Sequence, residues 1–265
     1  MIAARKYAWV GYTSARSNVA YLVEVATRVI FLGVILYIFL QLWRVTYTET
    51  NAQQLGGLTL AQMLWYLVMT ESLTLSNPLI AEEVDQDVRT GGLAIQLIRP
   101  LSYPFYRLWA ALGERAVRFS MNAAIGSIIA LAFVGPIPFT VGGLLMFVVS
   151  LPFAFVLHFQ GMFLIGLGAF WLEDTSGLRL IYSRTTMILG GMLIPLELFP
   201  DGWQPILRVL PFSGMVYGPA RMFVQPDPTF LADLIVRQGI AMIVFALLIA
   251  VVYRAAIKRI NANGG

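Results

Sequence analysis

The chain has 265 residues, of which 58% are apolar and 12% are charged, and its mean hydropathy is +0.76. This composition excludes an ordinary soluble globular protein, and no polar stretch approaches the roughly 50 residues that a soluble domain needs. The net charge of +4 does not indicate nucleic-acid binding, because the basic residues stand singly or in pairs at the ends of apolar runs. The absence of cysteine excludes disulfides and thiolate metal sites, and no other metal site is predicted.

The N-terminal stretch, residues 1–19, mixes apolar and aromatic positions such as Trp9 with the basic pair Arg5 and Lys6. A helix lying in the cytoplasmic membrane interface suits such a mixture. We therefore predict an interfacial helix there, followed by a transmembrane domain over residues 20–265. The basic start is not followed by a short apolar core and a cleavage site, so the pattern does not predict a signal peptide.

Six apolar segments are long enough to cross the hydrocarbon core of a bilayer, which takes about 20 helical residues. Lipid cannot satisfy exposed backbone N–H and C=O groups, and the segments lack the alternation of a membrane barrel. The sequence therefore predicts an all-α integral membrane protein with six transmembrane helices. The segments are approximately Tyr21 to Trp43, Leu58 to Ile80, Ala116 to Val134, Val141 to Trp171, Leu178 to Leu198 and Leu234 to Ala256.

The basic residues predict that both termini are cytoplasmic, because this orientation places most of them inside. A seventh span over Ile206 to Val224 is rejected, since prolines and glycines interrupt it and it would move the basic C-terminus outside. The residues expected inside are Arg5, Lys6, Arg16, Arg89, Arg99, Arg107, Arg179, Arg184, Arg254, Lys258 and Arg259. Those expected outside or near the outer face are Arg44, Arg208, Arg221 and Arg237.

The longest charged passage follows the second predicted span, at about residues 81–107. Its acidic residues crowd the first turns of a short predicted helix, which suits the helix dipole, and Asp85 can pair with Arg89 at i,i+4. Gly91 and Gly92 then end this helix. We predict a cytoplasmic coupling helix that contacts a separate energy-supplying subunit; an ordinary solvated connector is the alternative. The residues expected in this contact are Glu82, Glu83, Asp85, Asp87, Arg89, Gly91, Gly92, Arg99 and Pro100.

Polar residues inside the predicted spans are candidates for a translocation path or a subunit interface. Glu71 lies near the middle of the second span, and Thr74 and Asn77 fall on the same helical face. A structural hydrogen bond is the alternative role for Glu71. His158 is the only histidine and lies in the middle of the fourth span, where a packing role is more common than a proton relay.

Residues 195–224, which begin at the end of the fifth span, are rich in proline and glycine. Irregular backbone at membrane depth is tolerated only where protein or a wet cavity surrounds it. We predict a short broken helical pair that re-enters the outer leaflet and acts as an outer gate. An amphipathic helix lying on the outer surface is the alternative. The gate residues are expected to be Pro195, Phe199, Pro200 and Pro211.

Two stretches that contain glycine and proline at fixed spacings carry a resemblance to a known family. They read Gly92-Leu-Ala-x-x-Leu97-Ile-Arg99-Pro100 with Tyr103-Pro104 after it, and Gly190-Gly191-x-x-Ile194-Pro195-x-x-x-Phe199-Pro200 followed by Leu210-Pro211-Phe212. Over essentially its whole length the chain resembles the permease subunits of ABC-2 type transporters. In particular it is similar to the branch in which one ATPase works with two different short permeases.

This resemblance implies a type V exporter-like fold with half a transporter per chain, in the bacterial cytoplasmic (inner) membrane. A second permease, homologous or identical, would complete the dimer. The predicted helix from Glu82 to Arg89 would dock on an ATP-hydrolysing subunit, which would bind ATP and Mg²⁺. The fold does not fix a substrate, and we expect export of a hydrophobic or amphipathic compound.

The residues themselves agree with the need for a partner, because the phosphate-binding pattern G-x-x-x-x-G-K-[ST] does not occur in the chain. The chain is therefore predicted to be no enzyme and to carry no cofactor of its own. An ion-coupled secondary transporter is the main alternative, although it would need midplane ionisable groups and usually an internal repeat, and the sequence shows one such carboxylate, Glu71, and no obvious repeat. An intramembrane hydrolase is disfavoured, since Ser213 and the distant His158 form a weak pair.

Overall fold

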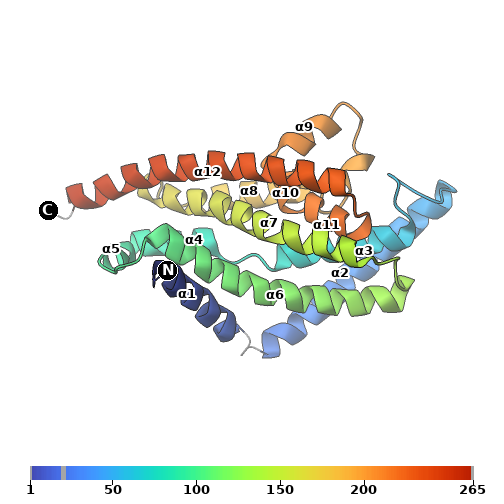
Figure 1. The fold of residues 1–265 in the computed structure, drawn as a ribbon, viewed down its shortest axis with the longest axis horizontal. Helices are drawn as coiled ribbons and strands as arrows, with labels where there is room; N and C mark the ends of the chain where they lie inside the picture. Colours follow the sequence, from blue (N-terminus) through green and yellow to red (C-terminus); the bar gives the residue numbers. More distant parts are fainter. Residues whose placement is uncertain (1, 19–21, 264–265) are drawn as a thin grey trace.

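A computed structural model describes residues 2–18 and 22–263, and this part of the chain is helical without any strand (Figure 1). Three long helices, α6, α7 and α12, run alongside one another, and α1 lies against the first half of α6. The α-helices are α1 (Ile2–Asn18), α2 (Leu22–Glu49), α3 (Leu60–Leu75), α4 (Ile80–Arg89), α5 (Gly92–Leu97), α6 (Tyr103–Val134), α7 (Val141–Leu167), α8 (Ser176–Leu189), α9 (Gln204–Val209), α10 (Pro211–Met215), α11 (Tyr217–Val224) and α12 (Pro228–Asn263). Two 3-10 turns, η1 (Gly168–Phe170) and η2 (Leu196–Leu198), complete the described elements.

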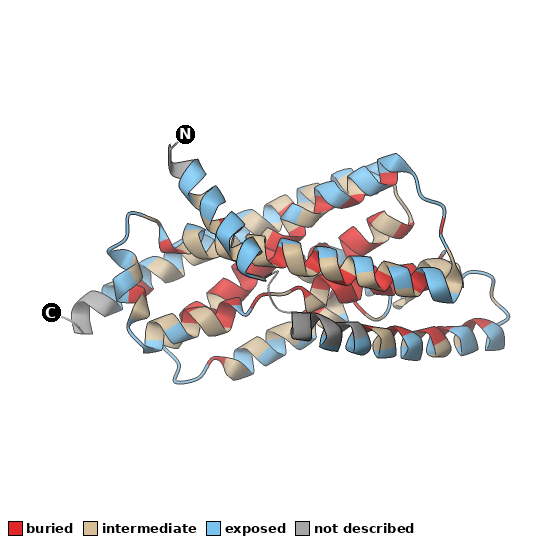
Figure 2. Cartoon of the chain, turned by 90° about the horizontal axis from the view of Figure 1, so that it is seen from below, coloured by how far each residue is buried: buried red, intermediate tan, exposed pale blue. Residues whose placement is uncertain are grey.

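Four of the described helices are long and apolar enough to cross a bilayer: α2, α6, α7 and α12. Their outward faces carry exposed large apolar side chains, including Ile240 and Leu247 on α12 and Ile30 and Ile38 on α2. Figure 2 shows the buried residues along the middle of the bundle and the exposed ones over the outer faces of the long helices. Exposed apolar surface of this extent requires lipid or another protein to cover it. The chain is therefore an all-α membrane protein.

The second and fifth predicted spans are shorter than the sequence suggested. Helix α3 has 16 residues and α8 has 14, and at 1.5 Å per residue neither alone reaches the roughly 30 Å of a hydrocarbon core. Helix α3 ends before Pro78, because proline disfavours the helical conformation in the residue before it. Helix α8 ends at Leu189 and is followed by Gly190 and by Gly191, which has a φ of 69° that glycine adopts readily.

The third predicted span also begins earlier than expected, at Tyr103 instead of Ala116. The stretch before Ala116 carries the charged residues Arg107, Glu114 and Arg115 among apolar and aromatic ones, and Figure 1 shows α1 packed beside the start of α6. The two helices approach most closely where Gly11 meets Gly113: a Cβ built on Gly113 lies 2.0 Å from the carbonyl oxygen of Gly11. Small residues permit such close backbone contact between helices. The Ser14 hydroxyl donates to the carbonyl of Ala110 at 2.8 Å in the same contact.

We expect the Gly113→Ala substitution to displace α1 from α6, because the clashing atom belongs to the backbone of Gly11 and cannot rotate away. The native chain has no cysteine, so an introduced pair, Ser14→Cys with Ala110→Cys, reports this contact by disulfide formation. The bridge should form readily in the otherwise native protein and in a Gly239→Ala control, where a Cβ meets no atom within 4 Å. Equal cross-linking with Gly113→Ala would show that the two helices do not cross here.

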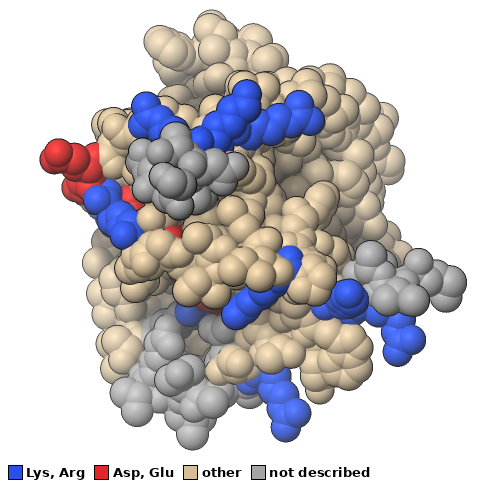
Figure 3. Space-filling model, turned by 90° about the vertical axis from the view of Figure 1, so that its left-hand side faces the viewer, with Lys and Arg blue, Asp and Glu red and all other residues tan. Residues whose placement is uncertain are grey.

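The two ends of the bundle differ in charge. One end gathers α4, α5, the start of α6 and the end of α12, whereas α9 and the end of α2 lie toward the other (Figure 1). Figure 3 views the first end and shows Lys and Arg side chains distributed around it, with Asp and Glu at one edge. The elements that carry most of the basic residues predicted to lie inside therefore meet at one end. The basic end of α12 is fixed there by Arg259, which donates to the carbonyl of Phe170 at 2.8 Å.

Candidate functional site

Helix α4 is seated on α7 through a glycine. Its apolar side chains Ile80, Ala81 and Val84 are all buried. A Cβ built on Gly166 of α7 lies 2.7 Å from the Val84 Cβ and 3.0 Å from the Ala81 carbonyl oxygen. The sequence pattern of α4, apolar at one face and charged around the rest, explains why it lies flat against the bundle. The glycine permits an approach that any side chain would prevent.

One arginine ties the acidic face of α4 to α6. The Arg107 guanidinium lies 2.5 Å from a carboxylate oxygen of Glu83 and also pairs with Asp87. The hydroxyl of Tyr103, one turn earlier in α6, donates to the same Asp87 carboxylate at 2.6 Å. Arg107 and Asp87 retain only 16% and 18% of their side-chain exposure. These bonds are charge-assisted and partly shielded from water, so they hold more strongly than surface pairs.

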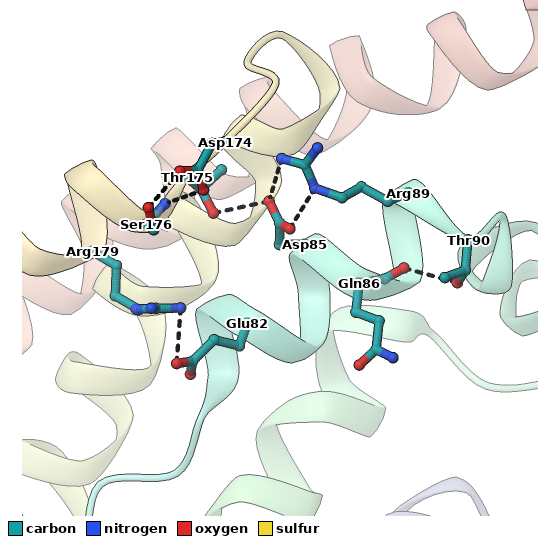
Figure 4. Close-up of polar contacts among 9 residues, drawn as sticks. All are labelled: Glu82, Asp85, Gln86, Arg89, Thr90, Asp174, Thr175, Ser176 and Arg179. Carbon is teal, nitrogen blue, oxygen red and sulfur yellow. Dashed lines mark hydrogen bonds and ion pairs between the residues drawn. The ribbon is translucent and has the colours of Figure 1, made fainter.

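The opposite edge of α4 is tied to α8 and to the loop before it (Figure 4). Asp85 pairs with Arg89 at 2.6 Å, as the i,i+4 spacing predicted, and accepts a hydrogen bond from Thr175 at 2.9 Å. These two partners lower the pKa of Asp85 below its ordinary value. Glu82 pairs with Arg179 of α8 at 2.8 Å. All four carboxylates predicted to face a partner subunit are therefore engaged within the chain.

The surface that remains free is the α4–α5 tip. Helix α4 ends at Arg89, the chain turns at Gly91 with a φ of 73°, and Gly92 begins α5. Ile95 is 63% exposed and Ile98 is 85% exposed. Figure 4 shows the Gln86 side chain directed away from the Asp85 and Glu82 contacts. We define the α4–α5 tip by its exposed residues, which are Gln86, Arg89, Thr90, Gly91, Ala94, Ile95, Leu97, Ile98, Arg99 and Pro100.

Three of the four predicted intramembrane residues meet at one cavity. Thr74, Asn77 and His158 line a space of about 270 Å³ between α3, α4, α7 and α8, which we call the polar cavity. Glu71 does not line it and lies buried in α3. The α8 side of the cavity was missed from sequence and carries Arg179, Ser183 and Thr186. Their spacing of four and three residues places them on one face of a helix, and this spacing is the signal by which the sequence could have revealed them.

Arg115 of α6 was also missed. It is 3% exposed, and one guanidinium nitrogen donates to the carbonyl of Leu73 at 3.2 Å. The guanidinium carbon lies 4.3 Å from the centre of the Phe155 ring, a cation–π contact. Because the buried guanidinium is held by a carbonyl and an aromatic ring, the fold fixes the position of the Arg115 side chain. The signal in the sequence was a basic residue inside an apolar helix, three residues before the next arginine, Arg118.

The predicted re-entrant region is a set of short helices that fold back into the bundle. Helix α11 packs against α3 and α7 with nearly all its residues buried. The backbone breaks at Val216, and the N–H of Tyr217 donates to the carbonyl of Gly190 at 3.1 Å. Glu197 pairs with Arg221 at 3.0 Å and accepts a hydrogen bond from Tyr217. Of the predicted gate residues, Pro195 is buried, Phe199 and Pro211 are half-buried and Pro200 is exposed.

We expect Glu197→Gln to loosen this packing, because the change removes the ion pair with Arg221 and weakens the acceptor for Tyr217. Hydrogen bonds to charged groups contribute about 1.5–3 kcal/mol each, so a clear fall in the thermal unfolding midpoint of the detergent-solubilised protein is expected. The matched control is Asp201→Asn, an exposed carboxylate whose contact with Gln204 is 3.4 Å long. Equal midpoints for the two variants would contradict a bracing role for Glu197.

Comparison with known proteins identifies the family. A search of curated proteins and a search of solved structures returned no match. The family model described as "ABC-2 family transporter protein" matches residues 31–264. This range includes α3 to α8, the α4–α5 tip and the short helices from η2 to α11 that fold back into the bundle. This match extends over most of the chain and agrees with the resemblance seen in its glycine and proline motifs. The chain therefore belongs to the ABC-2 transporter family and is a membrane-embedded permease component of an ABC transporter.

Proposed function

We propose that the chain is the permease subunit of an ATP-driven exporter and that the α4–α5 tip docks on a separate ATP-binding subunit. The observation that carries this proposal is the double attachment of α4. Arg107 fixes it to α6 on one edge, and Arg179 fixes it to α8 on the other. An element fixed in this way transmits a push on its free end to two membrane helices at once, which a solvated connector does not.

In this proposal, the energy for transport is supplied by another polypeptide. ATP and Mg²⁺ are bound by the partner subunit, and this chain contributes no catalytic residue. Nucleotide-driven closure of the partner moves the docked tip, and with it α6 and α8. ATP drives transport only if it favours one of the two membrane conformations over the other. The outer gate formed around Pro195, Phe199, Pro200 and Pro211 then opens when the inner end closes.

The proposed arrangement has six crossings with both termini in the cytoplasm of a bacterium. The short helices α3 and α8 complete their crossings with the segments that follow them. The exposed apolar faces of α2 and α12 support contact with lipid and with a second permease. This is the type V exporter-like arrangement, in the branch where one ATPase serves two short permeases. The cargo is expected to be hydrophobic or amphipathic.

Affinity purification of the tagged chain from mild detergent extracts of its native membranes tests this proposal. We expect an ATP-hydrolysing polypeptide to co-purify, and vesicles holding that complex to move cargo only with ATP. A chain that transports alone under an ion gradient would instead establish the secondary carrier, with Glu71 as its buried carboxylate. Purification without any ATP-binding partner, combined with ATP-independent transport, would overturn the proposal.

A further inference from the structure

The polar cavity contains hydrogen-bonding atoms that the described chain leaves unused. Asn77 Oδ1, His158 Nδ1 and Thr186 Oγ1 are buried and have no hydrogen-bond partner. His158 is 2% exposed and Thr186 is 6% exposed, and both line the cavity. Buried polar atoms are almost always paired, because an unpaired one costs the free energy of its lost hydration. Three such atoms around one cavity indicate a partner that enters from outside the chain.

Further groups at the cavity set the charge of that partner. Helix α4 begins at Ile80 without a side-chain cap, and Ile80, Ala81 and Glu82 line the cavity, so the first turn brings backbone N–H donors to it. The only charged residues in the lining, Glu82 and Arg179, pair with each other at 2.8 Å. The lining therefore has no net charge from these residues, but it presents both donors and acceptors.

The functional group that satisfies such a lining is a hydroxyl. A phosphate or carboxylate accepts hydrogen bonds from the α4 N–H groups but has no proton for Asn77 Oδ1. An ammonium donates to Asn77 and has nothing to offer the N–H groups. A hydroxyl does both, and it fits either orientation of the Asn77 amide and either tautomer of His158.

The remaining wall is apolar and reaches the surface. Met162 and Met187 also line the cavity, and methionine adapts to irregular apolar shapes. Leu79, which also lines the cavity, is 59% exposed. A volume of about 270 Å³ admits a head group of one small ring and excludes a larger molecule from full enclosure. The rest of a longer ligand would lie past Leu79, along apolar surface.

We propose that the polar cavity binds the uncharged, hydroxyl-bearing head of an amphipathic molecule. This rests on the transport function proposed above if the molecule is cargo. The same chemistry is supplied by a hydroxyl-rich membrane lipid that stays in place. The two sources differ in one respect: in the complex with its ATPase, bound cargo is released when ATP is hydrolysed, whereas a resident lipid is retained.

Photolabelling of the full chain in phospholipid nanodiscs tests the proposal. The probes are three decyl compounds with the same diazirine tail and a glucoside, a sulfate or a trimethylammonium head. We expect the glucoside to label the peptides that hold Asn77 and Thr186 roughly tenfold more than either charged probe. Equal labelling by a charged probe, or no labelling of these peptides by the glucoside, would overturn the proposal.

Two variants assign the effect to the cavity. Thr186→Val removes one hydroxyl without a change of shape and should lower glucoside labelling roughly tenfold, and Asn77→Leu should act in the same direction. Thr48→Val is the matched control, because Thr48 is exposed on α2 and its hydroxyl bonds only within that helix, to the carbonyl of Arg44. The thermal midpoint of each purified variant shows whether it is folded. Unchanged labelling in folded Thr186→Val and Asn77→Leu would contradict the site, whereas lost ATPase capture with retained labelling would contradict only the transport proposal.

Discussion

Replacing Gly166 with valine should uncouple the chain from its ATPase while the rest of the bundle stays folded. The new side chain would occupy the space of Val84, whose Cβ lies 2.7 Å from the position of a Cβ at Gly166, and would press on the Ala81 carbonyl. Overpacking of this kind costs about 1–3 kcal/mol, and the cost is avoided only if α4 moves away from α7. We expect the ATPase activity that co-purifies with the tagged chain to fall roughly tenfold or more.

The control for this prediction lies in the same helix. A Cβ built on Gly142 of α7 meets no atom within 4 Å, so Gly142→Val changes the same residue type without touching α4. Gly166→Ala should give an intermediate loss, since its single methyl already meets Val84. If Gly166→Val retained full ATPase capture, α4 would not need its seat on α7 in order to dock.

Replacing Arg107 with methionine should cause the largest loss of stability among single changes at the inner end. The variant leaves Glu83 and Asp87 without their shared cation, and Asp87 keeps only 18% of its side-chain exposure. Removing one partner of a mostly buried ion pair costs about 3 kcal/mol or more, because the other charge stays behind unpaired. We expect a lower thermal midpoint in detergent and faster proteolysis within the α4–α5 region.

Two further variants separate lost charge pairing from lost packing. The triple change Arg107→Met with Glu83→Gln and Asp87→Asn removes the whole group and should recover much of the stability. Arg89→Gln breaks an exposed i,i+4 pair with Asp85 and should cost no more than about 0.5 kcal/mol. If Arg107→Met were as stable as Arg89→Gln, the ionic attachment of α4 to α6 would be unimportant.

Local sequence patterns predicted the structural features that depend on residues close together in the chain. The apolar segments, the amphipathic α4, the Asp85–Arg89 pair and the turn at Gly91 all follow from short spacings. The early ends of α3 and α8 were missed, although Pro78 and Gly190 mark them, because the apolar runs continue past both residues. The early start of α6 was missed because Arg107, Glu114 and Arg115 interrupt the apolar residues before Ala116. The structure packs this part of α6 against α1 and pairs Arg107 with Glu83 of α4.

Contacts between distant residues could not be predicted from one sequence. Arg107 is 24 residues from Glu83, and this spacing does not indicate that the two would form an ion pair. The acidic residues of α4 were expected to contact the ATPase themselves, and this prediction stays untested. In the proposal above, the carboxylates position α4 and the exposed tip makes the contact. The polar cavity likewise needs four helices, and only its α3 side and His158 were visible beforehand.

A photo-cross-linking amino acid placed at Gln86 tests the docking claim most directly. Gln86 is exposed on α4, and Figure 4 shows its side chain directed away from the contacts of Asp85 and Glu82, so the substitution leaves the attachment of α4 intact. In native membranes, ultraviolet light should join this position to an ATP-binding polypeptide, while the same group at the exposed Trp203 before α9 should not reach it. Cross-linking to that polypeptide from Trp203 and not from Gln86 would contradict the account.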